Sequence, residues 1–486
     1  MKKIRYFVLF GVALAGGIAL LAAQAQSSVT LRIGTISVEQ EAMFRELEKD
    51  FNKKYPQWTI RFELSAQDAF DRALPLAFQS GDAPDILLNR FSIPVSTLRA
   101  NGWLAPLSEK NIPTSWRNQF PNYWFVPGWN VFEGKVWGVS LNDQDAWGPG
   151  YFYYNKAVLK KAGLDENKPP KTWNEWLNAC EAISKSGASC ITASFQNRAQ
   201  FERLWAPLTA VAQSSNPFNY RTGRFAFADP DRLRAWTFLK TLYDRKYFIP
   251  GVETATREAS RQVFGLNQAA FYVDGAMMPS VWRDSMGFKN LDYGVAAMPV
   301  PDSGLRGKLT KSLPRPNLFV TSRARNKEAA WAFVQYMTDP KGLYAKLYVS
   351  RGYGFLSFVN NESMFEGGLP ALQTISSISK NYRTFEPNYL LACPDMSRST
   401  ALSDALRSNT LPEENASVIE ALIKNQDWSL VAQRLTEGRQ KLLEERVAAE
   451  KTRGLSTSMD YFRNPNYRFG SNFGYSINYP VASCKK

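Results

Sequence analysis

The sequence contains no histidine among its 486 residues. This absence excludes Ser-His-Asp and Cys-His catalysis, imidazole-ligated zinc and acid–base catalysis by histidine. The four cysteines form no CxxC pair, so a structural zinc site is also unsupported. Dinucleotide-binding, P-loop and GxSxG motifs are missing too, and we expect no cofactor. The remaining catalytic option is a carboxylate pair, and neither Asp143 with Asp145 nor Asp82 with Asp85 has a diagnostic spacing.

Long apolar runs are confined to the N-terminus. Lys2, Lys3 and Arg5 precede an uncharged apolar stretch over residues 6–21, and a small-x-small site ends at Ala25. This pattern predicts a secretory signal peptide over residues 1–25, cleaved after Ala25. An uncleaved membrane anchor is the alternative, because the run is near the lower limit for a span. The cleavage point has no cysteine that could carry a lipid anchor. We therefore expect a soluble periplasmic protein.

The formal net charge is +15, or +12 once the three positive signal residues are removed. Lysine and arginine are scattered rather than clustered, which favours solvated surface over nucleic-acid binding and leaves an anionic ligand open. About 460 mature residues exceed what one hydrophobic core usually holds, so the length predicts two lobes.

An even number of cysteines in an exported chain favours disulfides, and four cysteines allow three pairings. Cys180 and Cys190 lie at the two ends of a short segment that reads as a helix end followed by a turn. We expect them to pair, which leaves Cys393 with Cys484 to fix the C-terminal tail. Free buried thiols are the alternative.

Helix and strand patterns alternate from the start of the mature chain. Apolar residues of period two predict strands, and Met43, Leu47 and Phe51 fall on one face of a predicted helix. Alternation of this kind is typical of α/β lobes with largely parallel sheets. The predicted strands are 29–34, 58–64 and 86–88, and the predicted helices between them are 41–54 and 66–80.

The middle of the chain has a recognisable order of elements. An aromatic strand over residues 151–154 leads into a short helix that Gly163 ends, and Thr172 with Glu175 forms a capping box at the start of the next helix. Residues 429–453 predict a last amphipathic helix, whose apolar positions are Leu430, Val431, Leu435, Leu442 and Leu443. Residues 455–486 have no helical period, and we expect an extended tail packed on a lobe.

This central segment resembles bacterial extracellular solute-binding proteins of family 1, the sugar-binding receptors of ABC importers. Similar motifs follow in the family's order at residues 81–85, 101–107, 264–278 and 326–337. The resemblance covers roughly residues 29–450, and the chain departs from the pattern in its length, its cysteines and its tail. It implies a periplasmic-binding-protein-like (class II) fold with two α/β lobes, a ligand cleft and a hinge.

The resemblance also implies where the lobes divide. Lobe one would comprise residues 26–145 plus 310–358, lobe two residues 146–309 plus 359–452, and residues 453–486 the tail. Glycine and proline at residues 148–150 and 299–307 suit the chain crossings between lobes. The receptor would capture a mono- or oligosaccharide as a monomer, close about its hinge and deliver the ligand to the permease, without nucleic acid as a partner.

Sugars are bound by aromatic rings and by planar polar side chains that form paired hydrogen bonds. The candidate aromatic residues are Trp147, Trp205, Trp282 and Tyr353, each of which could instead be a packing residue. The candidate polar residues are Glu39, Gln40, Asn89, Arg90, Gln196, Arg198 and Arg315. If two of the arginines face the cleft, an acidic or phosphorylated sugar becomes plausible.

Two other functions stay open at this point. A secreted carbohydrate-active enzyme would need two carboxylates about 5–10 Å apart across a cleft. A ligand-loaded partner of a membrane sensor would keep the fold and change only the downstream protein. We expect a receptor rather than an enzyme, because a binding function does not require the missing histidine.

Overall fold

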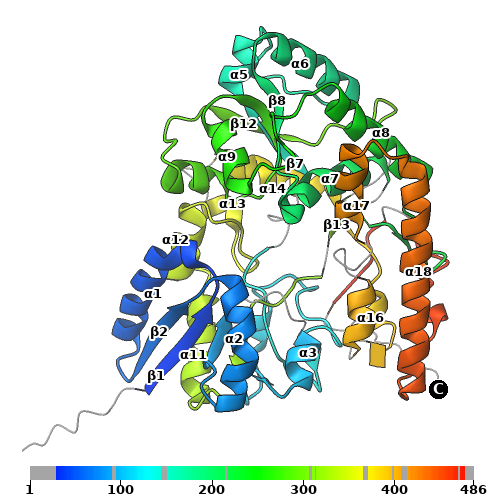
Figure 1. Cartoon of the computed structure of the whole chain (residues 1–486). Coiled ribbons are helices and arrows are strands. Elements are labelled where there is room, and N and C mark those ends of the chain that lie inside the picture. The colour runs from blue at the N-terminus through cyan, green and yellow to red at the C-terminus, as the bar shows by residue number, and fades with distance from the viewer. Residues whose placement is uncertain are drawn as a thin grey trace, which may run out of the picture.

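The computed structural model describes residues 29–89, 95–143, 150–213, 216–305, 309–311, 313–364, 370–393, 395–396, 399–406, 413–468 and 471–476. Two separate β-sheets organise these residues, each with helices around it (Figure 1). We call the part built on the five-stranded sheet lobe one and the part built on the four-stranded sheet lobe two. The mixed α/β architecture agrees with the predicted fold class, whereas the exact lobe boundaries stay predictions.

Lobe one has the strand order β2-β1-β3-β14-β4. The first three are parallel, and β14 runs antiparallel to β3 and β4. Its strands are β1 (Val29–Thr35), β2 (Trp58–Leu64), β3 (Ile86–Leu88), β4 (Leu104–Ala105) and β14 (Leu318–Thr321). Around them lie η1 (Val38–Gln40), α1 (Glu41–Lys54), α2 (Gln67–Ser80), α3 (Val95–Ala100), α4 (Thr114–Arg117), the hairpin β5 (Val131–Phe132) and β6 (Lys135–Val136), α11 (Lys327–Met337), α12 (Leu343–Ser350) and α13 (Asn361–Met364).

Lobe two has the strand order β12-β7-β11-β8, in which only β11 and β8 are parallel. The prediction of a largely parallel sheet was therefore wrong for this lobe, because β7 pairs antiparallel with both of its neighbours. Its strands are β7 (Tyr151–Asn155), β8 (Ser189–Thr192), β11 (Ala269–Tyr272) and β12 (Tyr293–Ala297). Around them lie α5 (Lys156–Lys161), α6 (Trp173–Lys185), α7 (Arg198–Ala212), the hairpin β9 (Phe218–Asn219) and β10 (Arg224–Phe225), α8 (Pro230–Asp244), α9 (Arg257–Gly265), α10 (Met278–Ser280), the π-helical turn η3 (Val281–Ser285) and α14 (Pro370–Tyr382).

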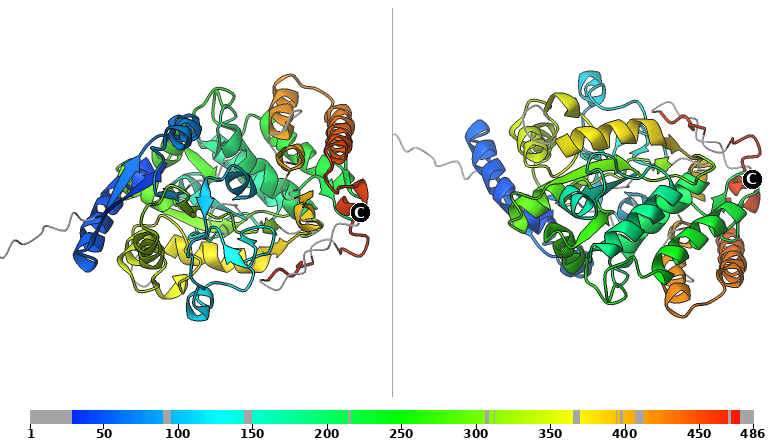
Figure 2. Two further views of the ribbon diagram at one scale, coloured as in Figure 1. Left: turned by 90° about the horizontal axis from the view of Figure 1, so that it is seen from below. Right: turned by 90° about the horizontal axis from the view of Figure 1, so that it is seen from above.

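The C-terminal region lines the side of the molecule opposite α1 (Figure 2). In Figure 1, α18 extends along this side from the level of α8 to that of α3. The region comprises β13 (Leu309–Lys311) paired with β15 (Arg383–Phe385), η4 (Tyr389–Leu391), α16 (Thr400–Ala405), α17 (Glu414–Ile423), α18 (Trp428–Thr452) and η5 (Met459–Phe462). Among the described residues, no helix combines the length and apolarity that a membrane span needs.

Predicted local patterns fold as expected where the apolar period is strong. Met43, Leu47 and Phe51 are buried on α1, and the bounds of α1 match the prediction. Asn155 caps α5, and the N–H of Glu175 donates to the Thr172 hydroxyl at 3.3 Å. The prediction was wrong for Leu430 on α18, because this side chain is 56 % exposed.

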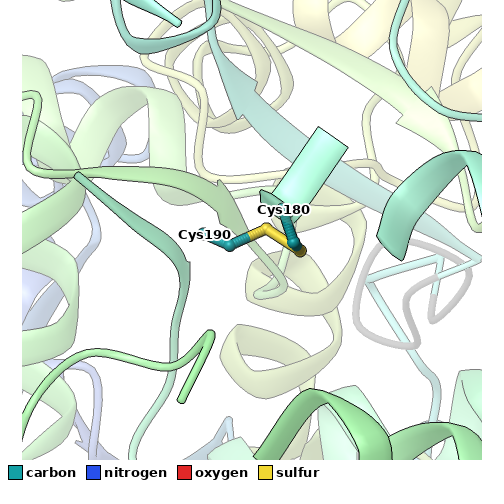
Figure 3. The surroundings of a disulfide bond; sticks show 2 residues. All are labelled: Cys180 and Cys190. Atoms are coloured by element: carbon teal, nitrogen blue, oxygen red, sulfur yellow. A yellow bond between two sulfur atoms is a disulfide. The ribbon is translucent and has the colours of Figure 1, made fainter. Parts of the chain in front are cut away.

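The predicted bond between Cys180 and Cys190 is present (Figure 3). Cys180 belongs to α6 and Cys190 to β8, and both side chains are fully buried. The bond therefore joins a helix to the strand that follows it in the lobe-two core. Cys393 is also disulfide-bonded. Its predicted partner, Cys484, lies outside the described residues, so that pairing stays a prediction.

Replacing both Cys180 and Cys190 with serine should lower the free energy of unfolding by about 3 kcal/mol, because the bond closes a loop of 10 residues. Urea denaturation followed by circular dichroism measures this loss. Ser184→Ala on the exposed face of the same helix is the matched control and should change little. A double variant as stable as this control would contradict a stabilising role for the bond.

Candidate functional site

The carboxyl ends of β1 and β3 lie side by side, because the two strands are parallel neighbours. Ser37, Glu39 and Gln40 follow β1, and Asn89 follows β3. Asn317 joins them, since it directly precedes β14, which runs antiparallel to β3. Ligands of open α/β sheets bind at this edge. The chain order therefore collects polar side chains from three distant segments at the binding edge of lobe one.

Three of these segments are linked by what we call the asparagine network: Asn89, Asn142 and Asn317, with Ser37 and Tyr348. The amide of Asn317 donates to the side-chain oxygens of Asn89 at 3.0 Å and Asn142 at 2.5 Å. All five residues are buried. The network continues outward as the Asn89 amide donates to the Ser37 hydroxyl at 2.7 Å and the Asn142 amide to the Tyr348 hydroxyl at 2.6 Å.

The backbone also fixes this edge. Asn89 has a φ of 58°, a left-handed conformation that asparagine tolerates better than most residues. Its N–H donates to the carbonyl of Asn317 at 2.7 Å. Unusual backbone conformations persist where the surroundings determine them, often at binding sites. Asn89 is therefore held rigidly by both its main chain and its side chain.

Gln40 carries an unfilled acceptor at this edge. The side chain is only 6 % exposed, and its Oε1 atom has no hydrogen-bond partner in the part of the chain that the structure describes. Leaving such an acceptor buried costs about 1–3 kcal/mol. A hydroxyl or N–H group supplied from outside the chain would remove that cost.

Glu39 beside it is exposed, although its carboxyl group is partly desolvated by the surrounding protein. This partial desolvation raises the pKa of Glu39, while the positive charge of Arg257 opposes the rise. Glu39 in turn contributes to the raised pKa values of Tyr348 and Tyr353, in both of which burial is the main cause. Glu39 thus lies within electrostatic range of α12 in lobe one and of α9 in lobe two.

The corresponding edge of lobe two is organised by Asp274, which follows β11 and is 0 % exposed. Arg261 donates to Oδ2 of Asp274 through Nε at 3.1 Å and Nη2 at 2.9 Å, and the Tyr272 hydroxyl donates to the same oxygen at 2.7 Å. Arg203 of α7 forms an ion pair with the other oxygen. Two guanidinium groups therefore share one buried carboxylate.

Arg203 has donors left over. Asp274 is its ion-pair partner, and within the described ranges the rest of the guanidinium makes no hydrogen bond. Burial lowers the pKa of Arg203, and the like charges of Arg261 and Arg257 act in the same direction. Arginine donors suit carboxylates, phosphates and hydroxyl oxygens. Arg203 is thus equipped to donate to an oxygen-rich ligand.

Two predicted aromatic candidates serve packing in this structure. Trp282 is 1 % exposed, stacks on Phe264 at 4.7 Å and donates its N–H to the Arg261 carbonyl at 3.1 Å. Trp205 is buried and donates to Oε1 of Glu414 at 2.8 Å. Neither ring has a face available to a ligand in this conformation, so ligand contact by either one stays an unsupported prediction.

The remaining candidates lie in several places. Tyr353 is half-buried against Tyr348, with ring centroids 5.8 Å apart. Gln196 is exposed before α7, and Arg198 begins that helix and pairs with Glu413 of the C-terminal region. Arg315 is exposed on the segment between β13 and β14. Arg90 and Trp147 lie outside the described residues. Of the candidates that lie among the described residues, Glu39, Gln40, Asn89 and Tyr353 are near one edge.

The segments that lead from lobe to lobe are joined at their lobe-one ends. Val139 bridges to Leu318, and Asn142 bridges to Leu356. The N–H of Asn317 donates to the Val139 carbonyl at 3.0 Å. The three segments around residues 139–143, 313–318 and 355–357 thus form one hydrogen-bonded seam, which includes two members of the asparagine network.

Solved structures with the same fold support this architecture. An ABC transporter solute-binding protein from Thermotoga lettingae, bound with alpha-D-tagatose, matches with a TM-score of 0.62 and 21 % identity over 86 % of this chain and 100 % of that one. The sugar-binding protein MalE of Xanthomonas citri matches with a TM-score of 0.59 and 19 % identity over 87 % of this chain and 99 % of that one. At this identity the likeness shows the fold.

Sequence relatives point the same way. A binding protein of Brucella abortus is 21 % identical over 350 residues, covering 69 % of this chain and 78 % of that protein. The sn-glycerol-3-phosphate-binding periplasmic protein UgpB of Brucella suis is 32 % identical over 182 residues, and the match spans 36 % of this chain and 41 % of that relative.

The family model for bacterial extracellular solute-binding proteins matches residues 37–343, which is more than half of the sequence. The matched residues include the polar edge of lobe one after β1 and the segment with Asp274. They also include two of the three segments of the seam, around residues 139–143 and 313–318. The chain therefore belongs to the bacterial extracellular solute-binding protein family.

Proposed function

We propose that this receptor captures a polyhydroxylated solute, a carbohydrate or a phosphorylated polyol, between its two lobes and delivers it to the permease of an ABC importer. The observation that carries this proposal is the buried Oε1 atom of Gln40 beyond the carboxyl end of β1, which has no hydrogen-bond partner among the described residues. A ligand hydroxyl is the kind of donor that this atom lacks. The neighbouring asparagine network would hold the accepting edge in place before the ligand arrives.

Lobe two supplies the complementary chemistry. Arg203 offers donors that can reach ring or hydroxyl oxygens, or a phosphate. Names of related proteins support both ligand classes: the Thermotoga lettingae protein binds tagatose, and the Brucella suis relative is named for sn-glycerol 3-phosphate. A ligand that touches both lobes would stabilise the closed state by shifting an existing equilibrium.

Calorimetry with a panel of sugars, polyols and sn-glycerol 3-phosphate tests the proposal, together with X-ray scattering of each loaded sample. We expect one ligand to bind with about −8 kcal/mol, a micromolar affinity, and to make the protein more compact. Binding without compaction would overturn closure about a hinge. If no member of the panel binds, the ligand classes proposed here are wrong.

Gln40→Leu offers a sharper test of the site. The leucine removes the unpartnered acceptor, so we expect unchanged or slightly higher stability in urea together with at least tenfold weaker binding. Gln335→Leu on the exposed face of α11 is the matched control, and its affinity should stay at the wild-type value. Equal affinities of the two variants would remove Gln40 from the site.

We also propose that the mature protein begins after Ala25 and acts outside the cytoplasm as a monomer. The charged and apolar pattern of residues 1–25 supports the cleavage, and membership in an extracellular family supports the compartment. The intact mass of the exported protein checks the cleavage point.

A further inference from the structure

The C-terminal tail contacts elements of both lobes. Its first half, residues 455–468, follows α18, and its second half, residues 471–476, lies beside β15. The two halves have different neighbours, which can be followed through their aromatic side chains. We call residues 455–468 and 471–476 together the tail strap.

The first half is fixed to lobe two. Phe462 and Tyr467 are buried in the lobe-two core. The ring of Tyr467 lies 5.8 Å from that of Tyr220 in an edge-on arrangement, and the N–H of Asn464 donates to the Tyr220 carbonyl at 2.7 Å. The same part of the strap packs closely against Gly223. A Cβ atom at position 223 would lie only 2.7 Å from the Arg463 side chain.

The second half reaches a separate apolar cluster that includes lobe-one residues. Tyr475 is buried beside Phe385 with ring centroids 5.8 Å apart, and Phe385 contacts Tyr123 at 4.7 Å. The buried members of this cluster are Val126, Leu313, Phe385, Leu391 and Tyr475, and Tyr123, Trp129 and Phe473 pack against it.

Hydrogen bonds hold this end in register. The N–H of Phe473 donates to the Phe385 carbonyl at 2.9 Å, and the N–H of Phe385 donates to the Asn472 side chain at 3.0 Å. The Tyr475 hydroxyl donates to the Glu386 carbonyl at 2.9 Å. Since β15 also pairs with β13 between the lobes, the strap adds a second connection beside one of the chain crossings.

Lobe one contributes the other side of the cluster through the loop that carries Tyr123, Val126 and Trp129. Phe125, next to Val126, packs on Trp116 and Phe120 of lobe one. The indole of Trp124 donates to the Ser140 carbonyl at 2.7 Å. Trp129 donates to the Pro314 carbonyl at 2.7 Å. Opening the two lobes would therefore pull the cluster apart or detach the strap from one of them.

We propose that the tail strap is a built-in restraint on hinge opening, which holds the ligand-free receptor closer to its closed form. The inference rests on the proposed hinge closure. Separating the lobes at this point exposes Tyr475 and part of Phe385, and exposure of such aromatic area is unfavourable. A restraint of this kind lowers the reorganisation needed for binding, because the closed state is already more populated.

Tyr475→Ala combined with Phe473→Ala tests the restraint, with scattering from the ligand-free protein as the readout. We expect the radius of gyration to rise by about 1 Å from the ~23 Å typical of a compact chain of this length. Phe248→Ala is the matched control, because it removes a buried aromatic ring that packs on Phe195 in the lobe-two core and is not a contact of the strap. It should destabilise the protein and leave the radius of gyration unchanged.

The readout needs no ligand, so this test can fail while the proposed ligand classes stand. An unchanged radius of gyration in the double variant, at full folding by circular dichroism, would overturn the restraint. An equal rise in the Phe248→Ala control would also overturn it, since general loosening would then explain the expansion. Faster hydrogen exchange at residues 121–131 in the double variant alone would support the strap.

Discussion

Asp274→Ala should lower the free energy of unfolding by about 4 kcal/mol, the largest effect we expect from a single substitution in this chain. The carboxylate is completely buried and faces Arg203 and Arg261. Its removal leaves two guanidinium groups without a counter-charge, and the Tyr272 hydroxyl loses its acceptor. Urea denaturation followed by tryptophan fluorescence measures the loss.

Two controls accompany this measurement. Asp274→Asn keeps an oxygen for Tyr272 but removes the charge. Its free energy of unfolding should therefore lie between those of the wild type and the alanine variant. Asp244→Ala breaks an exposed ion pair with Lys240 one helical turn away and should cost well under 1 kcal/mol. If Asp274→Ala lowered the free energy of unfolding by as little as this control, the carboxylate would not be needed to stabilise Arg203 and Arg261.

Asn317→Ala is expected to cost about 3 kcal/mol, because it breaks three hydrogen bonds of a fully buried side chain. Its amide group donates to Asn89 and Asn142, and its oxygen accepts from the Leu141 N–H at 2.8 Å. Each group left unpaired in the interior costs about 1–3 kcal/mol. The same urea titration reports this value, and ligand binding should weaken as well, since Asn89 loses its support.

Asn317→Asp separates polar pairing from side-chain volume. The aspartate keeps the shape and the acceptor for Leu141, but it places oxygens against the oxygens of Asn89 and Asn142. We expect it to be at least as destabilising as alanine. Asn174→Ala, on the exposed face of α6, is the neutral control. If Asn317→Asp were as stable as wild type, the donor roles assigned to Asn317 would be wrong.

Local patterns allowed most of the framework to be predicted. The bounds of α1 and β2 match the expected residues, because apolar side chains there repeat at the helix and strand periods. The pairing of Cys180 with Cys190 was predictable from their proximity in sequence. Membership in a receptor family also agrees with the prediction of a binding protein rather than an enzyme.

The candidate site was only partly predictable. Glu39, Gln40 and Asn89 could be found because they follow strands, and the end of a strand is visible in sequence. Asn142 and Asn317 were missed, because their hydrogen bond joins positions 175 residues apart and neither position shows a local pattern. Asp274 was missed as well, although an aspartate followed by a glycine shortly after a buried strand is a usable signal.

Aromatic content gave the least reliable guidance. The sequence has 14 tryptophans, and composition cannot separate a ring that stacks on a ligand from one that stacks on Phe264, as Trp282 does. That distinction depends on which face of the lobe-two sheet a helix covers. Such information arises only when segments distant in sequence pack together.

The position of the Cys180–Cys190 bond also bears on how the protein matures outside the cytoplasm. These are the first two cysteines to leave a translocation channel, and only nine residues separate them. Their bond can therefore form before Cys393 has emerged, at a time when no competing thiol of the same chain is present. Order of emergence thus selects the native pair, and the first oxidation step would not depend on later disulfide exchange to correct it.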